Sequence, residues 1–177
     1  MKIKRWIPFI LILSAVSVLL IGCGQKAVDQ SAAQELTLSG YGSAGASADD
    51  ALTLEKMMNY AIQDEYAARA EYEMILDAYG EQQLFRNIMS AEETHIATLT
   101  ALFQSYGYSI PKDTSADYVV LPASLNEAYQ TGVDAEIRNI AMYKEFMSYD
   151  LPSDAAQVFT SLMQASQSHL ASFEKHV

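Results

Sequence analysis

Glutamate and histidine residues interrupt the apolar faces of the helices that this sequence predicts. From Thr53 onward, apolar residues recur every three or four positions, the period of an α-helix with one buried face. Three glutamates and two histidines stand on those faces: Glu65, Glu92, His95, Glu136 and His169. Unpaired carboxylates in a dry core are costly, and no run of inward lysines or arginines offsets these acids. The pattern therefore indicates a metal site, and glutamate oxygens with imidazole nitrogens suit iron, manganese or zinc.

These residues are also predicted to lie at one height along the helices. Two residues on antiparallel neighbours are level when both are equally far along the chain from the turn between the helices. Glu65 and the Glu92-x-x-His95 pair are about equally far from Gly80, and the acid and imidazole of the last two helices are similarly placed around Leu151. With a rise of about 1.5 Å per residue, all five groups fall within about one helical turn. The sequence therefore predicts one layer of ligands near the middle of the helices.

Glycines, prolines and capping residues divide the chain into four long helical stretches. Gly80 and Gly107 end the first two, and Ser124-Leu125-Asn126-Glu127 supplies a capping box for the third. The stretches are predicted over about 54–78, 82–105, 125–147 and 153–176. The short link at Gly80 requires a hairpin, and the loop 108–122, with an extended piece at 118–121, can connect two hairpins. The predicted fold class is all-α, an antiparallel four-helix bundle with a crossover loop between helices 2 and 3.

The first residues have the features of a lipoprotein signal peptide. Lysines and an arginine precede an apolar run, Trp6 to Ile21, which ends at Gly22 and Cys23. An uncleaved membrane helix is the alternative, but the run is shorter than the roughly 20 residues that a span needs. Residues 1–22 are therefore predicted to be removed. Cys23 would carry acyl chains such as palmitate and tether the protein to the cell membrane, on the extracytoplasmic side (periplasm or cell surface).

A tether of low apolar content is predicted after the anchor. Residues 24–50 consist mostly of Ser, Ala, Gly and Gln and can bury too little surface to offset their ordering entropy. The predicted organisation is thus a signal peptide over 1–22, the lipidated cysteine and disordered tether over 23–51, and one helical domain over 52–177. Cys23 is the only cysteine, so no disulfide can form within the chain.

Charge limits the classes of partner. The chain has 11 basic and 22 acidic residues and a net charge of −11; loss of Lys2, Lys4 and Arg5 with the signal peptide leaves 8 minus 22, or −14. Such a surface argues against nucleic acid as a partner. The expected partners are the membrane, through the lipid anchor, and a metal ion. The sequence does not decide protein partners, and a homodimer is one option.

Two helical motifs resemble those of rubrerythrin-like proteins of the ferritin-like superfamily. Glu65-Tyr66-Ala67-Ala68-Arg69-Ala70-Glu71-Tyr72 is similar to their Glu-x-x-Ala-Arg-x-x-Tyr helix, and Glu92-Glu93-Thr94-His95 resembles their second ligand pair. More narrowly, the stretch from Leu52 to Phe173 resembles a prokaryotic secreted or lipoprotein family known as domain of unknown function 2202. The matching pattern is Glu65 with Ala68-Arg69, Tyr79-Gly80, Glu92-x-x-His95, Gly132-x-x-x-Glu136 and Ser166-x-x-His169-Leu170.

The resemblance implies a ferritin-like bundle and a set of metal ligands. By analogy with di-iron relatives, the ligands would be Glu65, Glu92, His95, Glu136 and His169, with Tyr72, Asn139 and Ser166 beside them. The chain departs from these relatives at two positions: Ser166 stands where a bridging carboxylate is expected, and Asn139 where rubrerythrins carry another acid. The remaining ligands could hold one metal, two metals weakly, or none.

Plainer interpretations exist for the same residues. Glu65 could pair with Arg69 one turn away, Glu92 and His95 could form a surface pair, and His169 could be a satisfied core histidine. Tyr72 and Tyr143 could serve only core packing.

Two function classes follow. One is a metal-dependent, di-iron-like oxidoreductase that oxidises ferrous iron or reduces peroxide; the other is a non-catalytic binding or envelope module with a vestigial site. The sequence names no substrate, because it contains no phosphate loop, nucleophile triad or electron-transfer cysteine centre, and it assigns no catalytic residue.

Overall fold

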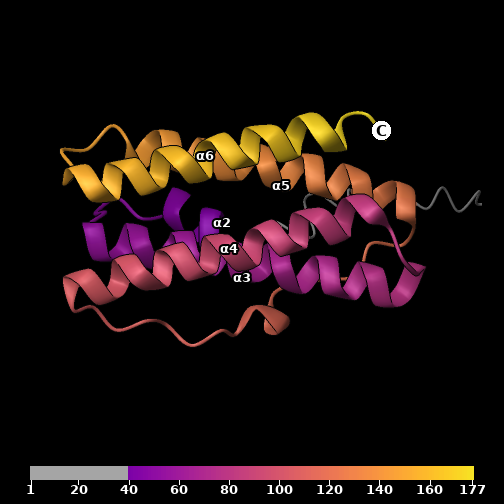
Figure 1. Cartoon of the computed structure of the whole chain (residues 1–177), viewed down its shortest axis with the longest axis horizontal. Coiled ribbons are helices and arrows are strands. Elements are labelled where there is room, and N and C mark those ends of the chain that lie inside the picture. Colours follow the sequence, from indigo (N-terminus) through magenta and orange to yellow (C-terminus); the bar gives the residue numbers. More distant parts are fainter. Residues whose placement is uncertain (1–39) are drawn as a thin grey trace, which may run out of the picture.

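Residues 40–177 are described by the structure, a computed structural model, and they form helices without any strand. Four long helices lie lengthwise beside one another, and one short helix lies outside them (Figure 1). The elements are α2 (Gly42–Ser47), α3 (Leu54–Tyr79), α4 (Gln83–Tyr106), the 3-10 helix η1 (Ser115–Asp117), α5 (Leu125–Phe146) and α6 (Ser153–Phe173). This part of the chain is all-α and compatible with a helical bundle, as the sequence predicts.

Capping residues begin and end the helices, and Gly80, Gly107 and Ser124 are those that the sequence predicts. The side chain of Thr53 accepts a hydrogen bond from the Lys56 amide at the start of α3, and Ser124 accepts one from the Glu127 amide at the start of α5. Gly80 follows α3 with a φ of 77°, and Gly107 follows α4 with a φ of 68°. These left-handed conformations strain other residues, which explains the glycines there.

Each long helix packs mainly against its neighbour in the chain. α3 packs most extensively against α4, and α5 against α6; smaller contacts join α4 to α6 and α3 to α5. The apolar interior is divided into two clusters. One contains Met57, Ile62, Leu99, Phe103, Phe146 and Phe159, and the other contains Tyr72, Ile75, Phe85, Ile88 and Phe173. On every long helix, the predicted ligand positions lie between these two clusters.

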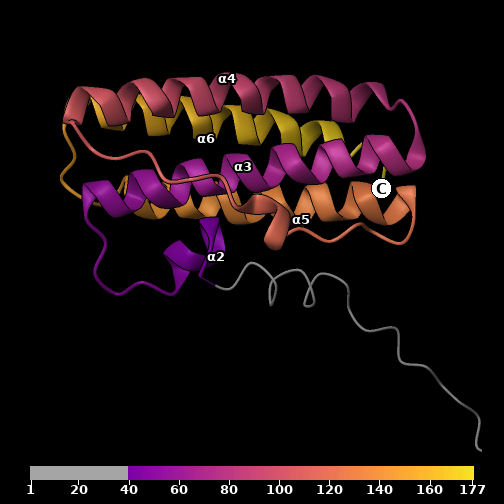
Figure 2. The same ribbon diagram turned by 90° about the horizontal axis from the view of Figure 1, so that it is seen from below.

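The connection from α4 to α5 runs along the outside of α3. Figure 2 shows it leaving the end of α4 and passing η1 before it reaches the start of α5. No strand forms over the predicted extended piece at 118–121; Tyr118 lies in a turn after η1, and its amide donates to the Ser115 carbonyl. Within residues 40–177, no helix is both long enough and apolar enough to cross a membrane.

A short helix, α2, forms where the sequence predicts a disordered tether. Tyr41 is 3% exposed and stacks on Tyr118 with ring centroids 4.2 Å apart. Gly45 approaches the neighbouring backbone so closely that an added Cβ would lie 2.7 Å from the Gly40 carbonyl carbon. The prediction of disorder is therefore wrong for residues 42–47. Their low apolar content suggests disorder, but their small side chains let the segment pack closely against its neighbours. The rest of the predicted tether up to residue 39, the signal peptide and Cys23 lie outside the described residues.

Candidate metal centre

Five predicted ligand residues from four helices meet between the two apolar clusters. α3 contributes Glu65, α4 contributes Glu92 and His95, α5 contributes Glu136 and α6 contributes His169. The three glutamates are only 2–3% exposed, and the histidine side chains are 12–14% exposed. The structure thus brings together all five residues that the helical pattern predicts, and we refer to them as the Glu/His cluster.

Glu92 is the central carboxylate of the Glu/His cluster. Its Oε2 atom lies 2.7 Å from His95 Nδ1, and its Oε1 atom lies 3.3 Å from His169 Nδ1. His95 Nδ1 is also 3.1 Å from Glu65 Oε2, and His169 Nδ1 is 3.2 Å from Glu136 Oε1. Each imidazole therefore contacts Glu92 and one further glutamate.

The cluster contains two sets of donors suited to a metal ion. Glu65, Glu92 and His95 form one set, and Glu92, Glu136 and His169 form the other, with one ligand atom of each residue within 4.8 Å of the others. Two carboxylates and one imidazole are donors that iron, manganese and zinc accept. The residues present therefore fit such a metal, with Glu92 shared between two positions.

Burial and neighbouring charges divide the three glutamates into different protonation states. Burial, reinforced by the charge of Glu92, raises the pKa of Glu65 well above its usual range. Burial also opposes ionisation of Glu92, but hydrogen bonds with His169 and His95 lower the pKa of Glu92 to about 2. Burial raises the pKa of Glu136 to about 7, although the hydrogen bond with His169 opposes this shift. Without metal, Glu92 is therefore the glutamate that ionises most readily, and burial favours the protonated form of Glu65.

The two histidines compensate the buried charge. Burial lowers the pKa of a histidine, but the hydrogen bonds with Glu65 and Glu92 outweigh burial and raise the pKa of His95 to about 10. Hydrogen bonds with Glu136 and Glu92 raise the pKa of His169 to about 9 in the same way. Metal ligation needs neutral imidazoles and ionised carboxylates, so a metal ion would have to displace protons from this cluster.

The residues predicted beside the ligands have different surroundings. Tyr72 is fully buried against Phe85 and Phe173, and burial raises the pKa of its hydroxyl well above the usual range. Ser166 is 4% exposed and lies one helical turn before His169. Asn139 is 6% exposed, and its Oδ1 atom is buried without a hydrogen-bond partner in the described part of the chain.

Tyr143 has a role that sequence reasoning missed. The sequence pattern places it on the apolar face of α5, where core packing is the ordinary interpretation. In the structure its buried hydroxyl donates a hydrogen bond to Glu65 Oε1 over 2.9 Å. A tyrosine at a core position level with buried acids is the available signal for such a contact.

Two of the plainer interpretations of the ligands disagree with the contacts. Arg69 does not pair with Glu65; its Nη2 atom lies 2.5 Å from Asp113 Oδ2 in the loop before η1. The surface-pair interpretation of Glu92 and His95 is wrong because Glu92 is 3% exposed. His169 is partly buried and its Nδ1 atom contacts Glu92 and Glu136, which agrees with a satisfied core histidine as well as with a metal ligand.

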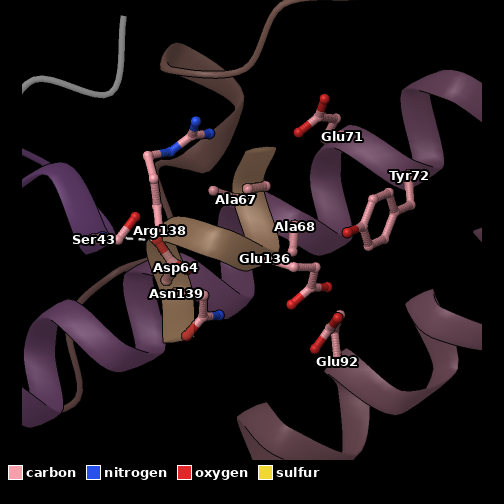
Figure 3. A pocket seen from close by; sticks show the side chains of 11 residues that line it. Ser43, Asp64, Ala67, Ala68, Glu71, Tyr72, Glu92, Glu136, Arg138 and Asn139 are labelled. Carbon is pink, nitrogen blue, oxygen red and sulfur yellow. Dashed lines mark hydrogen bonds between the residues drawn. The ribbon is translucent and has the colours of Figure 1, made fainter. Parts of the chain in front are cut away.

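A small cavity of about 20 Å³ adjoins the Glu/His cluster (Figure 3). Glu92 and Glu136 border it on the cluster side. Its remaining polar lining comprises Ser43, Asp64, Glu71, Tyr72, Arg138 and Asn139. Sequence reasoning assigned no role to Asp64, Glu71 or Arg138. Burial raises the pKa of Asp64, against the effect of a 2.7 Å hydrogen bond from the Ser43 amide.

Comparisons with known proteins bear on the family and on the fold. Residues 55–141 match the model of a family described as an uncharacterized protein domain (DUF2202), which supports the resemblance to that family. The matched range contains Glu65, Glu92, His95 and Glu136 but ends before His169. The crystal structure of a hypothetical protein from Methanococcus jannaschii DSM 2661 is similar, with a TM-score of 0.61, 21% identity and coverage of 67% of this chain and 76% of that chain. At this identity the likeness shows the fold alone. No curated protein matches the chain.

Proposed function

We propose that the Glu/His cluster binds iron or a similar transition metal inside a ferritin-like bundle. The observation that carries the proposal is the position of Glu92, whose two oxygens reach the imidazoles of His95 and His169 from different helices. A carboxylate shared between two three-donor sets is the arrangement that a two-metal site needs. The proposed bundle is antiparallel, with residues 107–124 as the crossover; the mainly pairwise helix contacts and the similar fold support it.

One position should bind metal more tightly than the other. In the set formed by Glu65, Glu92 and His95, the hydroxyl of Tyr143 donates a hydrogen bond to Glu65 and holds this ligand in place. The other set has Ser166 nearby, where a further carboxylate would complete it. We therefore propose one tightly held metal ion per chain and a second, weaker one.

A redox-active metal at this site would supply electron transfer to an oxidant such as dioxygen or peroxide. Glu65, Glu92, His95, Glu136 and His169 would position such a metal, and the carboxylates would neutralise its charge; burial keeps most of the site away from water. The histidines are more exposed than the glutamates, at 12–14% of each side chain. Oxidoreductase chemistry, either ferroxidase or peroxide reduction, is therefore the activity that we propose.

A second candidate function is a non-catalytic binding or envelope module with a vestigial site. The ion pairs within the Glu/His cluster favour this function, because protonated His95 and His169 already balance the negative charge of Glu92 and Glu136. Such a cluster can persist as a structural network without metal.

The proposed test is the metal content of wild type and two matched variants. The chain is loaded with ferrous iron without oxygen, or with manganese, and the bound metal is then measured. Glu92→Gln should abolish binding, because it removes the shared carboxylate. Glu93→Gln changes the exposed neighbouring acid and should bind like wild type. Absence of metal from wild type would reject metal binding and favour the non-catalytic module.

We also propose that Cys23 anchors the protein in the membrane, facing the extracytoplasmic side. The apolar run and the Gly22-Cys23 pair support this proposal. Cys23→Ala should release the domain from the membrane fraction or block maturation. An intact mass that begins at an unmodified Met1 would contradict the proposal.

A further inference from the structure

The gap between α3 and α5 leads outward from the Glu/His cluster. These two helices contact each other less than either contacts its hairpin partner, and small side chains line the gap: Ala67, Ala68 and Ala135. The cavity of about 20 Å³ lies there, with Glu92 and Glu136 on the cluster side (Figure 3). A space of this size holds one water-sized particle, which matches a single ion that has lost its outer waters.

The lining of the gap favours positive ions. Asp64, Glu71, Glu92 and Glu136 line this cavity together with a single basic residue, Arg138. A cleft lined by acids raises the local concentration of cations and disfavours anions. The excess of acidic residues over the whole chain acts in the same direction.

Asn139 provides an independent sign that a ligand uses this gap. Its side chain lines the cavity one helical turn after Glu136, and its Oδ1 atom is buried without a hydrogen-bond partner among residues 40–177. Leaving a buried acceptor unpaired is costly, so the surroundings should offer it a partner at some stage. An amide oxygen beside a carboxylate can replace part of the water shell of a metal ion.

A wider cavity of about 150 Å³ lies between α2 and α5, further from the cluster. Ser43 and Arg138 line both cavities and therefore lie at the boundary between them. Ser47 and Glu145 provide further oxygens in the wider one. This space is large enough for an ion with several waters, whereas the inner one is not.

α2 covers the outer side of the gap. Figure 2 shows α2 beside α3 and α5, on the face away from α4 and α6, and it contacts both of the covered helices. The Gly42 amide donates to Gln63 Oε1 over 3.2 Å, and the Ser43 amide donates to Asp64 Oδ1 over 2.7 Å. These two hydrogen bonds attach α2 to α3 beside the cavity.

We propose that divalent cations reach the Glu/His cluster through the gap between α3 and α5, with α2 as a displaceable cover and Asn139 as the first inner ligand. The cation enters the wider cavity with part of its water shell and sheds water as it passes Ser43 and Arg138. Asn139 and Glu136 then take the place of those waters. This proposal rests on the proposed function, because it concerns access to the same metal site.

The test measures how fast the full-length chain binds Co²⁺, by the visible absorption of the bound ion after rapid mixing. Gly45→Ala places a Cβ 2.7 Å from the Gly40 carbonyl carbon and from Tyr60 Cε1, which should loosen α2. Loosening should speed binding by about fivefold or more, because the uncovered state becomes more populated. Asn139→Leu removes the inner oxygen and should slow binding by a similar factor.

Gly107→Ala is the matched control for a strained glycine substitution. Gly107 has a φ of 68° at the end of α4, and an added Cβ there meets nothing within 4 Å. This variant should bind Co²⁺ at the wild-type rate. Amide exchange should show faster opening of α2 in Gly45→Ala and not in Gly107→Ala.

The outcomes separate the access route from the function. Faster binding by Gly45→Ala together with slower binding by Asn139→Leu supports the route, since general destabilisation cannot produce opposite changes. Wild-type rates in both variants, with full Co²⁺ binding at equilibrium, would overturn the route and leave metal binding intact. A wild-type chain that binds no Co²⁺ at equilibrium would overturn both.

Discussion

The imidazole rings of His95 and His169 stack with their centroids 5.8 Å apart, although they come from different helices. Glu92 lies against both, with one oxygen at 2.7 Å from His95 Nδ1 and the other at 3.3 Å from His169 Nδ1. Two imidazoles that both face acids through Nδ1 retain protons when no metal is bound. The cluster is therefore a proton-binding network in the apo-protein, and metal must compete with those protons.

The apo-protein should lose stability as the pH rises from about 5 to about 10. A group whose pKa is higher in the folded state than in the unfolded state stabilises the fold at pH values below its unfolded-state pKa. This stabilisation is lost as the pH rises through the folded-state pKa. The pKa of Glu136 is raised to about 7, that of His169 to about 9 and that of His95 to about 10. The pKa of Glu92 is instead lowered to about 2, so its contribution to stability is lost as the pH falls. This loss occurs only below its unfolded-state pKa of about 4.5.

The measurement is thermal unfolding with a chelator present at about pH 5, 7 and 9. The melting temperature should fall by about 5 °C or more over this range. Glu136→Gln should flatten the part of the curve between about pH 5 and 7, because it removes that titration. Substitution of exposed His176 by Gln should leave the curve unchanged. A melting temperature that rises over the same range would contradict the proposed protonation states.

Metal affinity should change with pH in the opposite direction. Binding needs neutral imidazoles and ionised carboxylates, so affinity should increase from about pH 5 to about pH 9. Calorimetry of Co²⁺ binding in buffers with different ionisation enthalpies should show release of roughly one to three protons per chain near neutral pH. Binding without proton release would mean that the ion lies elsewhere than at His95 and His169.

The hydroxyl of Tyr143 should stabilise both the apo-protein and the tighter metal position. Tyr143→Phe removes the 2.9 Å hydrogen bond to Glu65 Oε1 and leaves a buried carboxyl with one partner fewer. The free energy of unfolding should fall by about 1–3 kcal/mol. Urea unfolding measures this change, and Tyr72→Phe is a control at another fully buried tyrosine of the core. Equal stability of wild type and Tyr143→Phe would show that the hydroxyl contributes only packing.

The limits of the long helices follow from local residues. Gly80, Gly107 and Ser124 carry the conformational and capping signals, so the predicted 54–78 and 82–105 agree closely with Leu54–Tyr79 and Gln83–Tyr106. The cluster was predictable for a related reason. Glu65 and Glu92 interrupt apolar faces, and helical rise alone places them level.

Features that depend on docking between distant segments were not predictable from the sequence. Asp64 lies beside the apolar face of α3, and its burial depends on α2, whose Ser43 amide bonds to it. α2 itself is poor in large apolar residues, and its contact relies on glycine at a close approach. The pairing of Arg69 with Asp113 likewise depends on the course of the long connection over α3. None of these contacts has a periodic signal in the chain.

Ser166 lies on α6 one turn before His169 and is 4% exposed. Residues three apart on a helix share a face, so a glutamate at position 166 would reach toward the set formed by Glu92, Glu136 and His169. Without metal, a further buried carboxylate near Glu136 should lower stability by about 1–3 kcal/mol. With metal, the same carboxylate becomes a ligand, and its negative charge is compensated.

Ser166→Glu should therefore lower the melting temperature of the apo-protein and raise the amount of tightly bound metal from about one to about two ions per chain. Ser166→Gln is the matched control, because it adds a side chain of similar size without the charge. Ser166→Gln should lower stability through steric crowding, as Ser166→Glu does, and should bind no additional metal. The measurements are metal content per chain and melting temperature, each with and without manganese. If Ser166→Glu and Ser166→Gln bind equal amounts of metal and melt alike under both conditions, position 166 does not face the Glu/His cluster as proposed.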